Sequence, residues 1–406
     1  MNTQPTPEPS EAATGSVPEV FAAFFKLGLT SFGGPLAHIG YFRDAFVLRR
    51  KWLDEDAYAD LVSLCQFLPG PASSQVGFLI GVGRTGGLAG GIAAWIAFTL
   101  PSVLLLLAFA YGAASFDGPI AEGVLHGLKL VAVAVVAQAI WGMARTLTPD
   151  ATRIAIAIVA LAIVLLAGAA IGQLSAIALG ALAGVVLCRK GVEPKPGGLM
   201  FSVSRRAGVT ALSLFAAIFV AGPLLAATGF HAFAMFDAFY RSGALVFGGG
   251  HVVLPLLEAS VVSPGWVSQE AFLAGYGVAQ AVPGPLFSIA AYMGALSAPW
   301  PNGLAGAVIA VFAIFLPGFL LAYGVLPFWS ALRSRANAQA AMRGANAAVV
   351  GLLAAAFYDP VWTSAVLTPL DFVLALIAFA MLVWLKWPSW SAVVFLVVAV
   401  PLAVAF

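Results

Sequence analysis

The sequence has little charge. Only 9% of its 406 residues are Asp, Glu, Lys or Arg, and the formal net charge is +2, whereas about a quarter of a soluble domain is charged. Hydrophobic residues make up 62% of the chain, and apolar runs long enough to cross a bilayer recur along it. These features predict an all-α, polytopic integral membrane protein in contact with lipid. No basic cluster suggests binding to nucleic acid.

Catalytic and metal-binding motifs are also missing. Cys65 and Cys188 are too few and too far apart for a disulfide framework or a metal site. The sequence contains no Walker loop, no His-Glu-x-x-His and no Cys-x-x-Cys. We therefore expect no enzyme activity, no cofactor and no metal. Without a nucleotide motif, transport would be powered by ion gradients or would run downhill.

The apolar segments suggest two halves joined by a polar linker. Residues 1–19 lack the basic start of a signal peptide and are expected to be a disordered tail. The first half is expected at 20–188, the linker at 189–206 and the second half, with the C-terminal helices, at 207–406. About thirteen transmembrane segments are expected, at roughly 20–42, 58–82, 88–113, 120–143, 153–170, 172–188, 207–229, 236–258, 270–298, 302–328, 340–358, 369–385 and 389–405.

An internal repeat is visible at an offset of about 215 residues. The matched positions keep their order and spacing, which indicates duplication of an ancestral half. They are Phe32 with Phe247, Gly33-Gly34 with Gly248-Gly249, Trp52 with Trp266, Gln66 with Gln280, Pro69-Gly70-Pro71 with Pro283-Gly284-Pro285, and Pro101 with Pro317. The two halves differ at two matched positions, because Pro35 aligns with Gly250 and Arg43 aligns with Glu258.

The relative orientation of the two halves follows from counting segments. Seven segments separate loop 43–56 from its equivalent 259–270, and an odd number of crossings turns the second half over. The first loop is basic and the second has no Lys or Arg, which agrees with an inverted repeat. The same count, however, places the basic linker 189–206 outside. If segment 58–82 is re-entrant, the linker moves inside, but the repeat becomes parallel unless a second segment also fails to span. The inverted reading is favoured, and the absolute orientation stays open.

Glycine and proline inside apolar segments mark the candidate site. Pro-Gly-Pro removes two N–H donors, and Gly-Gly lets the backbone leave helical geometry at little cost. A helix broken inside the membrane presents a half-helix N-terminus with about +0.5 charge, which attracts anions. The candidate substrate-binding residues are Lys26, Ser31, Phe32, Gly33, Gly34, Gln66, Pro69, Gly70, Pro71, Arg241, Phe247, Gly248, Gly249, Gly250, Gln280, Pro283, Gly284 and Pro285.

The polar and charged candidates each have a second explanation. Lys26 and Arg241 occupy equivalent positions and would meet an anion from two sides, or they snorkel to the interface. Gln66 and Gln280 would contact substrate or form interhelical hydrogen bonds, and His38 is either titratable or structural. The proton-coupling candidates are His251 and Glu258.

The duplicated pattern resembles the chromate ion transporter family in its long, two-domain form. The resemblance covers nearly the whole chain and is carried by Phe25–Pro35, Trp52–Leu53, Leu68–Pro71, Phe247–Gly250 and Pro283–Pro285. It implies a bacterial or archaeal inner-membrane protein with thirteen segments and oppositely oriented halves. It also implies that the protein exports chromate and so confers chromate resistance.

Physical chemistry is compatible with that function and with close alternatives. Expelling a dianion from a negative-inside cell is favoured by about 4.6 kcal/mol per 100 mV, so proton antiport is an addition rather than a requirement. Chromate is a tetrahedral dianion like sulfate, and a sulfate or other oxyanion carrier is therefore the alternative. A channel-like or structural membrane protein is the alternative of another class. The oligomeric state, a homodimer included, is open.

Overall fold

Every regular element is a helix in the residues that the computed structural model describes, which are 15–113, 118–167, 169–189 and 203–405. A helix satisfies its own backbone hydrogen bonds, as a bilayer requires. The expected count of thirteen spans is not confirmed, because other apolar segments are shorter or broken. Within the described part of the chain, five helices are long and apolar enough to cross a membrane: Leu88–Gly112, Ile120–Leu147, Arg205–Ala226, Gly303–Arg333 and Ala336–Ala365.

The four segments that contain the duplicated Gly and Pro motifs are each broken into two helices. The breaks fall at the motifs themselves, as the sequence predicts. Short 3₁₀ turns η2 (Gly250–Val252) and η4 (Leu286–Ser288) follow the two breaks of the second repeat. The pairs are α1 (Val17–Thr30) with α2 (Gly34–Phe42), α3 (Glu55–Phe67) with α4 (Ala72–Thr85), α10 (His231–Ala244) with α11 (Val253–Leu257), and α12 (Gln269–Ala279) with α13 (Ile289–Leu296).

The two broken segments of the first repeat fold back on themselves as hairpins. Phe24 of α1 packs edge-on against Phe42 of α2, with ring centroids 5.5 Å apart. Arg84, at the end of α4, lies 5.1 Å over the ring of Trp52, which precedes α3. Arg84 also pairs with Glu19 in the first turn of α1. Both hairpins therefore start and finish at one end of the molecule, and their tips point towards its middle.

The second repeat forms the same two hairpins. Ser242 Oγ of α10 lies 3.1 Å from Ser260 Oγ, just beyond α11. The ring of His231, which begins α10, lies edge-on at 4.5 Å from Trp266, which precedes α12. The N–H of Ala298, just after α13, donates to the carbonyl of Trp266 at 3.0 Å. Trp52 and Trp266 thus mark equivalent places in the two repeats.

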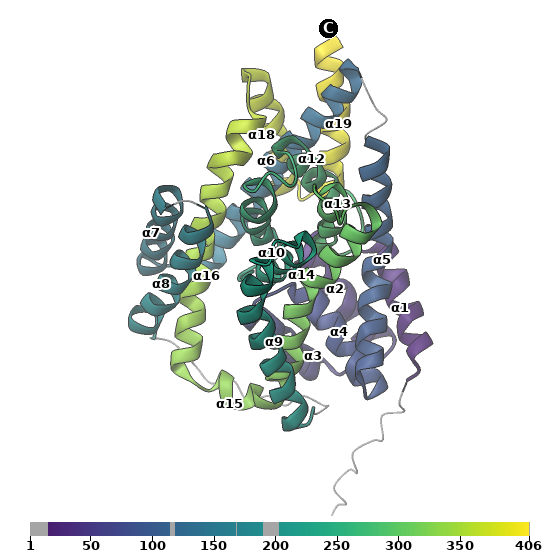
Figure 1. Cartoon of the computed structure of the whole chain (residues 1–406), viewed down its shortest axis with the longest axis vertical. Coiled ribbons are helices and arrows are strands. Elements are labelled where there is room, and N and C mark those ends of the chain that lie inside the picture. Colours follow the sequence, from purple (N-terminus) through teal and green to yellow (C-terminus); the bar gives the residue numbers. More distant parts are fainter. Residues whose placement is uncertain (1–14, 114–117, 168, 190–202, 406) are drawn as a thin grey trace, which may run out of the picture.

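The long helices α5 (Leu88–Ala113) and α14 (Gly303–Val325) show that the repeats are inverted. Trp95, early in α5, packs against Phe319, late in α14, with centroids 5.6 Å apart. At the other end, a Cβ on Gly303 would lie 3.2 Å from Tyr111 Oη. The two helices therefore run in opposite directions. Figure 1 accordingly shows α3 and α4 in the lower half and α12 and α13 in the upper half.

The remaining helices interlock the repeats. Helix α6 (Pro119–Leu147) packs against α12, α18 (Pro369–Val383) and α19 (Ser389–Ala405) of the other repeat. Helix α16 (Ala336–Ala356) packs against α7 (Ala151–Ala167) and α8 (Ala169–Leu187). Helices α16 and α8 approach each other so closely that Gly344 of α16 has no room for a side chain. A Cβ there would lie 2.0 Å from the carbonyl oxygen of Gly180 in α8. Small residues at helix contacts are typical of membrane proteins.

Short elements complete the described chain. The π-helices η1 (Arg43–Arg49) and η3 (Glu258–Val262) begin at the pair of positions where the repeat changes the sign of its charge. Other connectors are η5 (Leu326–Phe328), α15 (Trp329–Arg333), η6 (Phe357–Trp362) and α17 (Thr363–Ala365). Within the described ranges, α9 (Arg205–Ala226) is the helix without a counterpart in the first repeat.

The expected boundaries shift slightly. Helix α1 begins at Val17, inside the expected tail 1–19, and residues 1–14 lie outside the described part. Residues 190–202 of the expected linker also lie outside it.

The two ends of the molecule differ in charge. The end where α1 begins, here called the basic end, carries loops rich in Lys and Arg, while the described loops 227–230, 263–268 and 297–302 at the other end carry none. Because both hairpins of the first repeat return to the basic end, the chain on either side of the linker lies there too. This removes the conflict left by segment counting. The basic residues are Arg43, Arg49, Arg50, Lys51, Arg84, Arg205, Arg206, Arg333 and Arg335.

Candidate functional site

The four hairpin tips meet in the middle of the molecule. The N–H of Gly70 donates to the carbonyl of Val246 at 2.7 Å, and the N–H of Gly284 donates to the carbonyl of Ser31 at 2.9 Å. Gly70 corresponds to Gly284 and Ser31 to Val246, so the two hydrogen bonds are equivalent under the repeat. Each joins a Pro-Gly-Pro break to the break of the other repeat. We call this meeting point the tip junction.

Both Pro-Gly-Pro glycines are required by conformation and by space. Gly70 and Gly284 have φ angles of 119° and 102°, which favour glycine. A Cβ on Gly70 would lie 3.0 Å from Gly318 Cα, and one on Gly284 would lie 2.9 Å from Ser102 Oγ. Gly318 and Ser102 occupy matching positions in α14 and α5. Each break therefore packs against the long helix of the other repeat.

Pro35 and Gly250, which are matched positions at which the two repeats differ, also lie at the junction. A Cβ on Gly250 would lie 3.0 Å from Pro35 Cγ. The two residues, which are equivalent in the repeat, thus touch each other, and only one of them can be bulky. The other break residues expected in the site lie within or beside the same four tips: Phe32, Gly33, Gly34, Pro69, Pro71, Phe247, Gly248, Gly249, Pro283 and Pro285.

A buried histidine connects two tips of the first repeat. His38, fully buried on α2, places Nε2 at 3.3 Å from the carbonyl oxygen of Ser31 and Nδ1 at 3.4 Å from Ser73 Oγ. A carbonyl only accepts, so Nε2 carries a proton, and in the neutral ring Nδ1 then accepts from the Ser73 hydroxyl. His38 therefore serves as a neutral link between the tip of α1 and the first turn of α4.

The two equivalent glutamines differ in their surroundings. Gln66 is exposed, whereas Gln280 is buried and its backbone carbonyl accepts from Ser389 Oγ at 2.8 Å. A glutamine that sequence reasoning did not single out lies closer to the junction. Gln75 Nε2 donates to the carbonyls of Pro69 and Gly318, at 2.9 and 3.0 Å.

The two expected cations have different surroundings. Arg241 pairs with Asp237 on its own helix at 2.8 Å, donates to the carbonyl of Phe219 and lies over that ring. Lys26 is exposed on α1, which packs against α5 and α4. The expectation that these two residues face an anion together is therefore not supported by their contacts.

The two proton-coupling candidates lie on either side of α11. His251 Nδ1 contacts the hydroxyl of Tyr276 at 2.8 Å, beside the junction. Glu258 begins η3 and is half-buried. Among the described residues, no group of three His, Cys, Asp or Glu side chains forms a metal site.

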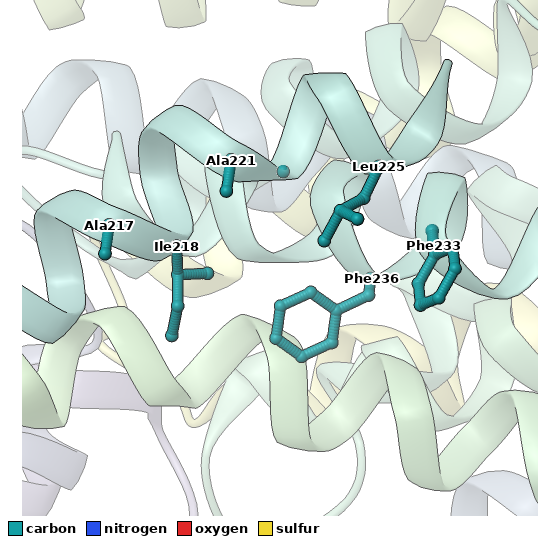
Figure 2. Close-up of a pocket in the computed structure, with 7 residues that line it drawn as sticks. Ala217, Ile218, Ala221, Leu225, Phe233 and Phe236 are labelled. Atoms are coloured by element: carbon teal, nitrogen blue, oxygen red, sulfur yellow. The ribbon is translucent and has the colours of Figure 1, made fainter. Parts of the chain in front are cut away.

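A pocket of about 260 Å³ lies away from this polar region, between α9 and α10 (Figure 2). Figure 2 shows Ile218, Leu225, Phe233 and Phe236 around it, and the other lining residues are Ala217, Ala221 and Gly222. No charged or hydroxyl-bearing side chain lines it, so it does not suit a hydrated anion.

Comparison with known proteins agrees with the duplication. A sequence model described as "Chromate transporter" matches residues 18–185 and again 233–404. The chain belongs to the chromate transporter family. The two matches correspond to the two structural repeats and leave out the whole of α9, the helix without a counterpart.

Several curated relatives cover most of the chain. The "Chromate transport protein" of Pseudomonas aeruginosa is 27% identical over 85% of this chain and 81% of its own length. The "Probable chromate transport protein" of Synechococcus elongatus is 28% identical over 84% of each. The "Chromate transport protein" of Cupriavidus metallidurans is 27% identical over 85% of this chain and 82% of its own. No solved structure matches.

Sequence reasoning missed several polar residues near the tips. Ser73, Ser74 and Gln75 follow the first Pro-Gly-Pro, and Thr99 and Ser102 lie one turn apart on α5; all are buried. A signal was present, since three consecutive polar residues interrupt an apolar segment just after a break. Serine and threonine are common in membrane helices, however, and a single one carries little information.

Proposed function

We propose that this chain is a secondary transporter that exports chromate across the inner membrane of a bacterium or archaeon and so confers chromate resistance. The observation that carries the proposal is the match to the chromate transporter family in both repeats. Relatives named as chromate transport proteins, aligned over more than four-fifths of the chain, support the same substrate.

The tip junction is the proposed site of passage. Helix α4 begins at the junction, and α2 begins three residues after Ser31, so two half-helix N-termini face the middle of the molecule. Such termini carry partial positive charge and free N–H groups, which suit an anion. Inverted repeats with broken helices are the usual way that secondary transporters form a central site.

Membrane potential supplies the proposed driving force. Moving a dianion out of a negative-inside cell releases about 4.6 kcal/mol per 100 mV. Proton antiport would add to this, and the half-buried carboxyl group of Glu258 is the first candidate proton carrier. His251, bound to Tyr276, is the second candidate.

The charge of the loops supports an orientation for export. Basic loops stay in the cytoplasm, so the basic end is the proposed cytoplasmic end, and both hairpins of the first repeat enter from that side. The hairpins of the second repeat then enter from outside.

Transport by everted membrane vesicles tests the function. Vesicles that contain the protein should accumulate chromate with saturation, and an imposed pH gradient should change the rate if protons are exchanged. Sulfate that fails to compete would favour a chromate-selective site, and full competition would favour a general oxyanion carrier. Chromate uptake equal to that of vesicles without the protein would overturn the proposal.

A further inference from the structure

Buried polar atoms without partners gather where α4 begins. Among the described residues, these include Ser31 Oγ, Ser74 Oγ, Gln75 Oε1, Trp95 Nε1 and Thr99 Oγ1, each sealed from solvent and without a hydrogen-bond partner. Ser31 and Gln75 are fully buried, and Ser74 and Thr99 are each 3% exposed. Buried hydroxyls are normally satisfied. Such atoms are places where a polar ligand or a water molecule would bind.

These atoms surround the uncapped start of a long half-helix. Helix α4 has 14 residues, and its N-cap, Pro71, provides no side-chain cap. Ser74 lies on the face of α4 that continues through Phe78 and Gly81, and these two residues pack against Gly91 and Gly90 of α5. Ser74 therefore faces α5.

Thr99 and Trp95 complete the region from α5. Trp95 packs against Phe315 and Phe319 of α14, and Thr99 is one turn further towards the tip junction on the same face. The unpartnered indole N–H of Trp95 can only donate. A helix N-terminus, an indole N–H and hydroxyl groups suit an anion and disfavour a cation.

The equivalent region of the second repeat is apolar. The counterparts of Ser31, His38 and Ser73 are Val246, Val253 and Phe287, and those of Gln75 and Thr99 are Ile289 and Phe315. Ser288, the counterpart of Ser74, already donates to the carbonyl of Pro285 at 2.6 Å. The duplication therefore retains the fold on both sides, whereas the unpartnered buried hydroxyls of the described residues all lie in the first repeat.

We propose that the protein has a single oxyanion-binding site, formed by the first turn of α4 with the hydroxyls of Ser31, Ser74 and Thr99, and that His38 is its positioning residue. This inference rests on the proposed function and specifies where its substrate binds. The ligand is a tetrahedral oxyanion, and the donors are neutral, so the site holds a dianion without a permanent countercharge.

His38 acts through its two neighbours rather than on the ligand. Its Nε2–H fixes the carbonyl of Ser31, and its Nδ1 takes the proton of Ser73, so the two tips keep their spacing. Gln at this position can still donate to the carbonyl of Ser31, whereas Val, the residue of the second repeat, cannot.

Binding to the purified full-length protein in nanodiscs tests the proposal, with potassium chromate and potassium sulfate as titrants in calorimetry. Ser74→Ala and Thr99→Val should each weaken chromate binding by about tenfold, the effect of losing one hydrogen bond to a charged group. Ser288→Ala is the matched control and should bind within about twofold of wild type. Because Ser74 and Thr99 lack partners, both variants should unfold at the same temperature as wild type or higher without ligand.

His38 provides the second arm. His38→Val should weaken chromate binding, and His38→Gln should restore most of it. Wild-type protein that binds chromate as tightly as Ser74→Ala and Thr99→Val would overturn the single site and leave the transport function standing. Absence of both binding and vesicle uptake in wild type would overturn the function and the site together. If the substitutions weaken sulfate binding as much as they weaken chromate binding, the site is supported and is assigned to oxyanions generally.

Discussion

Gly70 combines two constraints that can be separated by a matched pair of variants. Gly70→Ala places a Cβ against Gly318 and at φ 119°, whereas Gly86→Ala, at φ 71°, meets nothing within 4 Å. In both variants the left-handed backbone lowers the free energy of unfolding by about 1–2 kcal/mol. Only in Gly70→Ala does overpacking lower it by a further amount, about 1–3 kcal/mol. We expect Gly70→Ala to lose more than about tenfold in chromate uptake by everted vesicles and Gly86→Ala to stay near wild type. Equal rates would contradict a role for the close packing of the tips.

Arg241 should matter for stability and not for substrate affinity. Arg241→Ala leaves the largely buried carboxylate of Asp237 without its partner, which costs about 3 kcal/mol. We expect a lower unfolding temperature with an unchanged KM for chromate, and recovery of the unfolding temperature in the double variant Arg241→Ala with Asp237→Asn. Lys26→Ala, on the exposed face of α1, is the control and should unfold like wild type. A raised KM in both single variants would restore the paired-cation hypothesis.

At the residue scale, sequence patterns located the breaks but not the donors. Gly70 and Gly284 were identifiable because backbone requirements allow few substitutes, and the duplication confirmed the pattern. The burial of Gln280 and exposure of Gln66 were not predictable, since both follow the same local pattern and differ only in tertiary contacts. Arg241 differs, because its partner Asp237 lies one helical turn away and the spacing of the pair was a signal in the sequence.

The hairpin α3–α4 is tied to the second repeat by one buried ion pair. Asp60 of α3 accepts from Arg333 Nη1 at 2.7 Å and from Trp329 Nε1 at 3.0 Å, both on α15. Asp60→Asn removes the charge that Arg333 faces and should lower the unfolding temperature, with a cost of about 3 kcal/mol. Asp56→Asn, exposed on the same helix, is the control. Thermal unfolding of both purified variants measures the effect, and matching temperatures would show that the pair does not hold the hairpin.

At the element scale, the sequence predicted where helices stop but not where the chain goes next. A proline and glycine break is compatible with a kinked span and with a hairpin, because both leave the same apolar periodicity. Contacts between the two helices on either side of a break show that it is a hairpin. Examples are Phe24 with Phe42, and Trp266 with Ala298. The count of thirteen spans assumes that every apolar segment crosses, and for this reason it separates the basic linker from the other basic loops.

The whole molecule should insert with its basic end in the cytoplasm. The two native cysteines are buried, so single cysteines can be added at exposed loop positions. In intact cells, a membrane-impermeant maleimide should label Ser263→Cys, and it should label Lys51→Cys only after permeabilisation. The reverse labelling would invert the orientation. Labelling of both from one side would contradict the inverted repeat.

Neither repeat should work alone. Because α16 packs against α7 and α8, and α6 against α18 and α19, a separated half exposes helix faces that the other half covers. We expect chains divided within residues 190–202 to give no chromate uptake when either half is expressed alone, and to regain uptake when both are expressed together. Uptake by one half alone would show that the tip junction can form between two identical copies.

The unpaired helix α9 has a consequence for the history of the gene. The first repeat begins and ends at the basic end, so a second copy joined to it directly would insert in the membrane with the same orientation. Helix α9 runs from that end, where Gly208 abuts Pro327, to the opposite end, where Gly222 abuts Asp237. One added crossing therefore converts a tandem gene fusion into an antiparallel pair. Two identical separate chains would have to insert in opposite orientations to form the same pair, whereas the fused chain fixes each copy in one orientation, so each copy can carry polar residues that the other lacks.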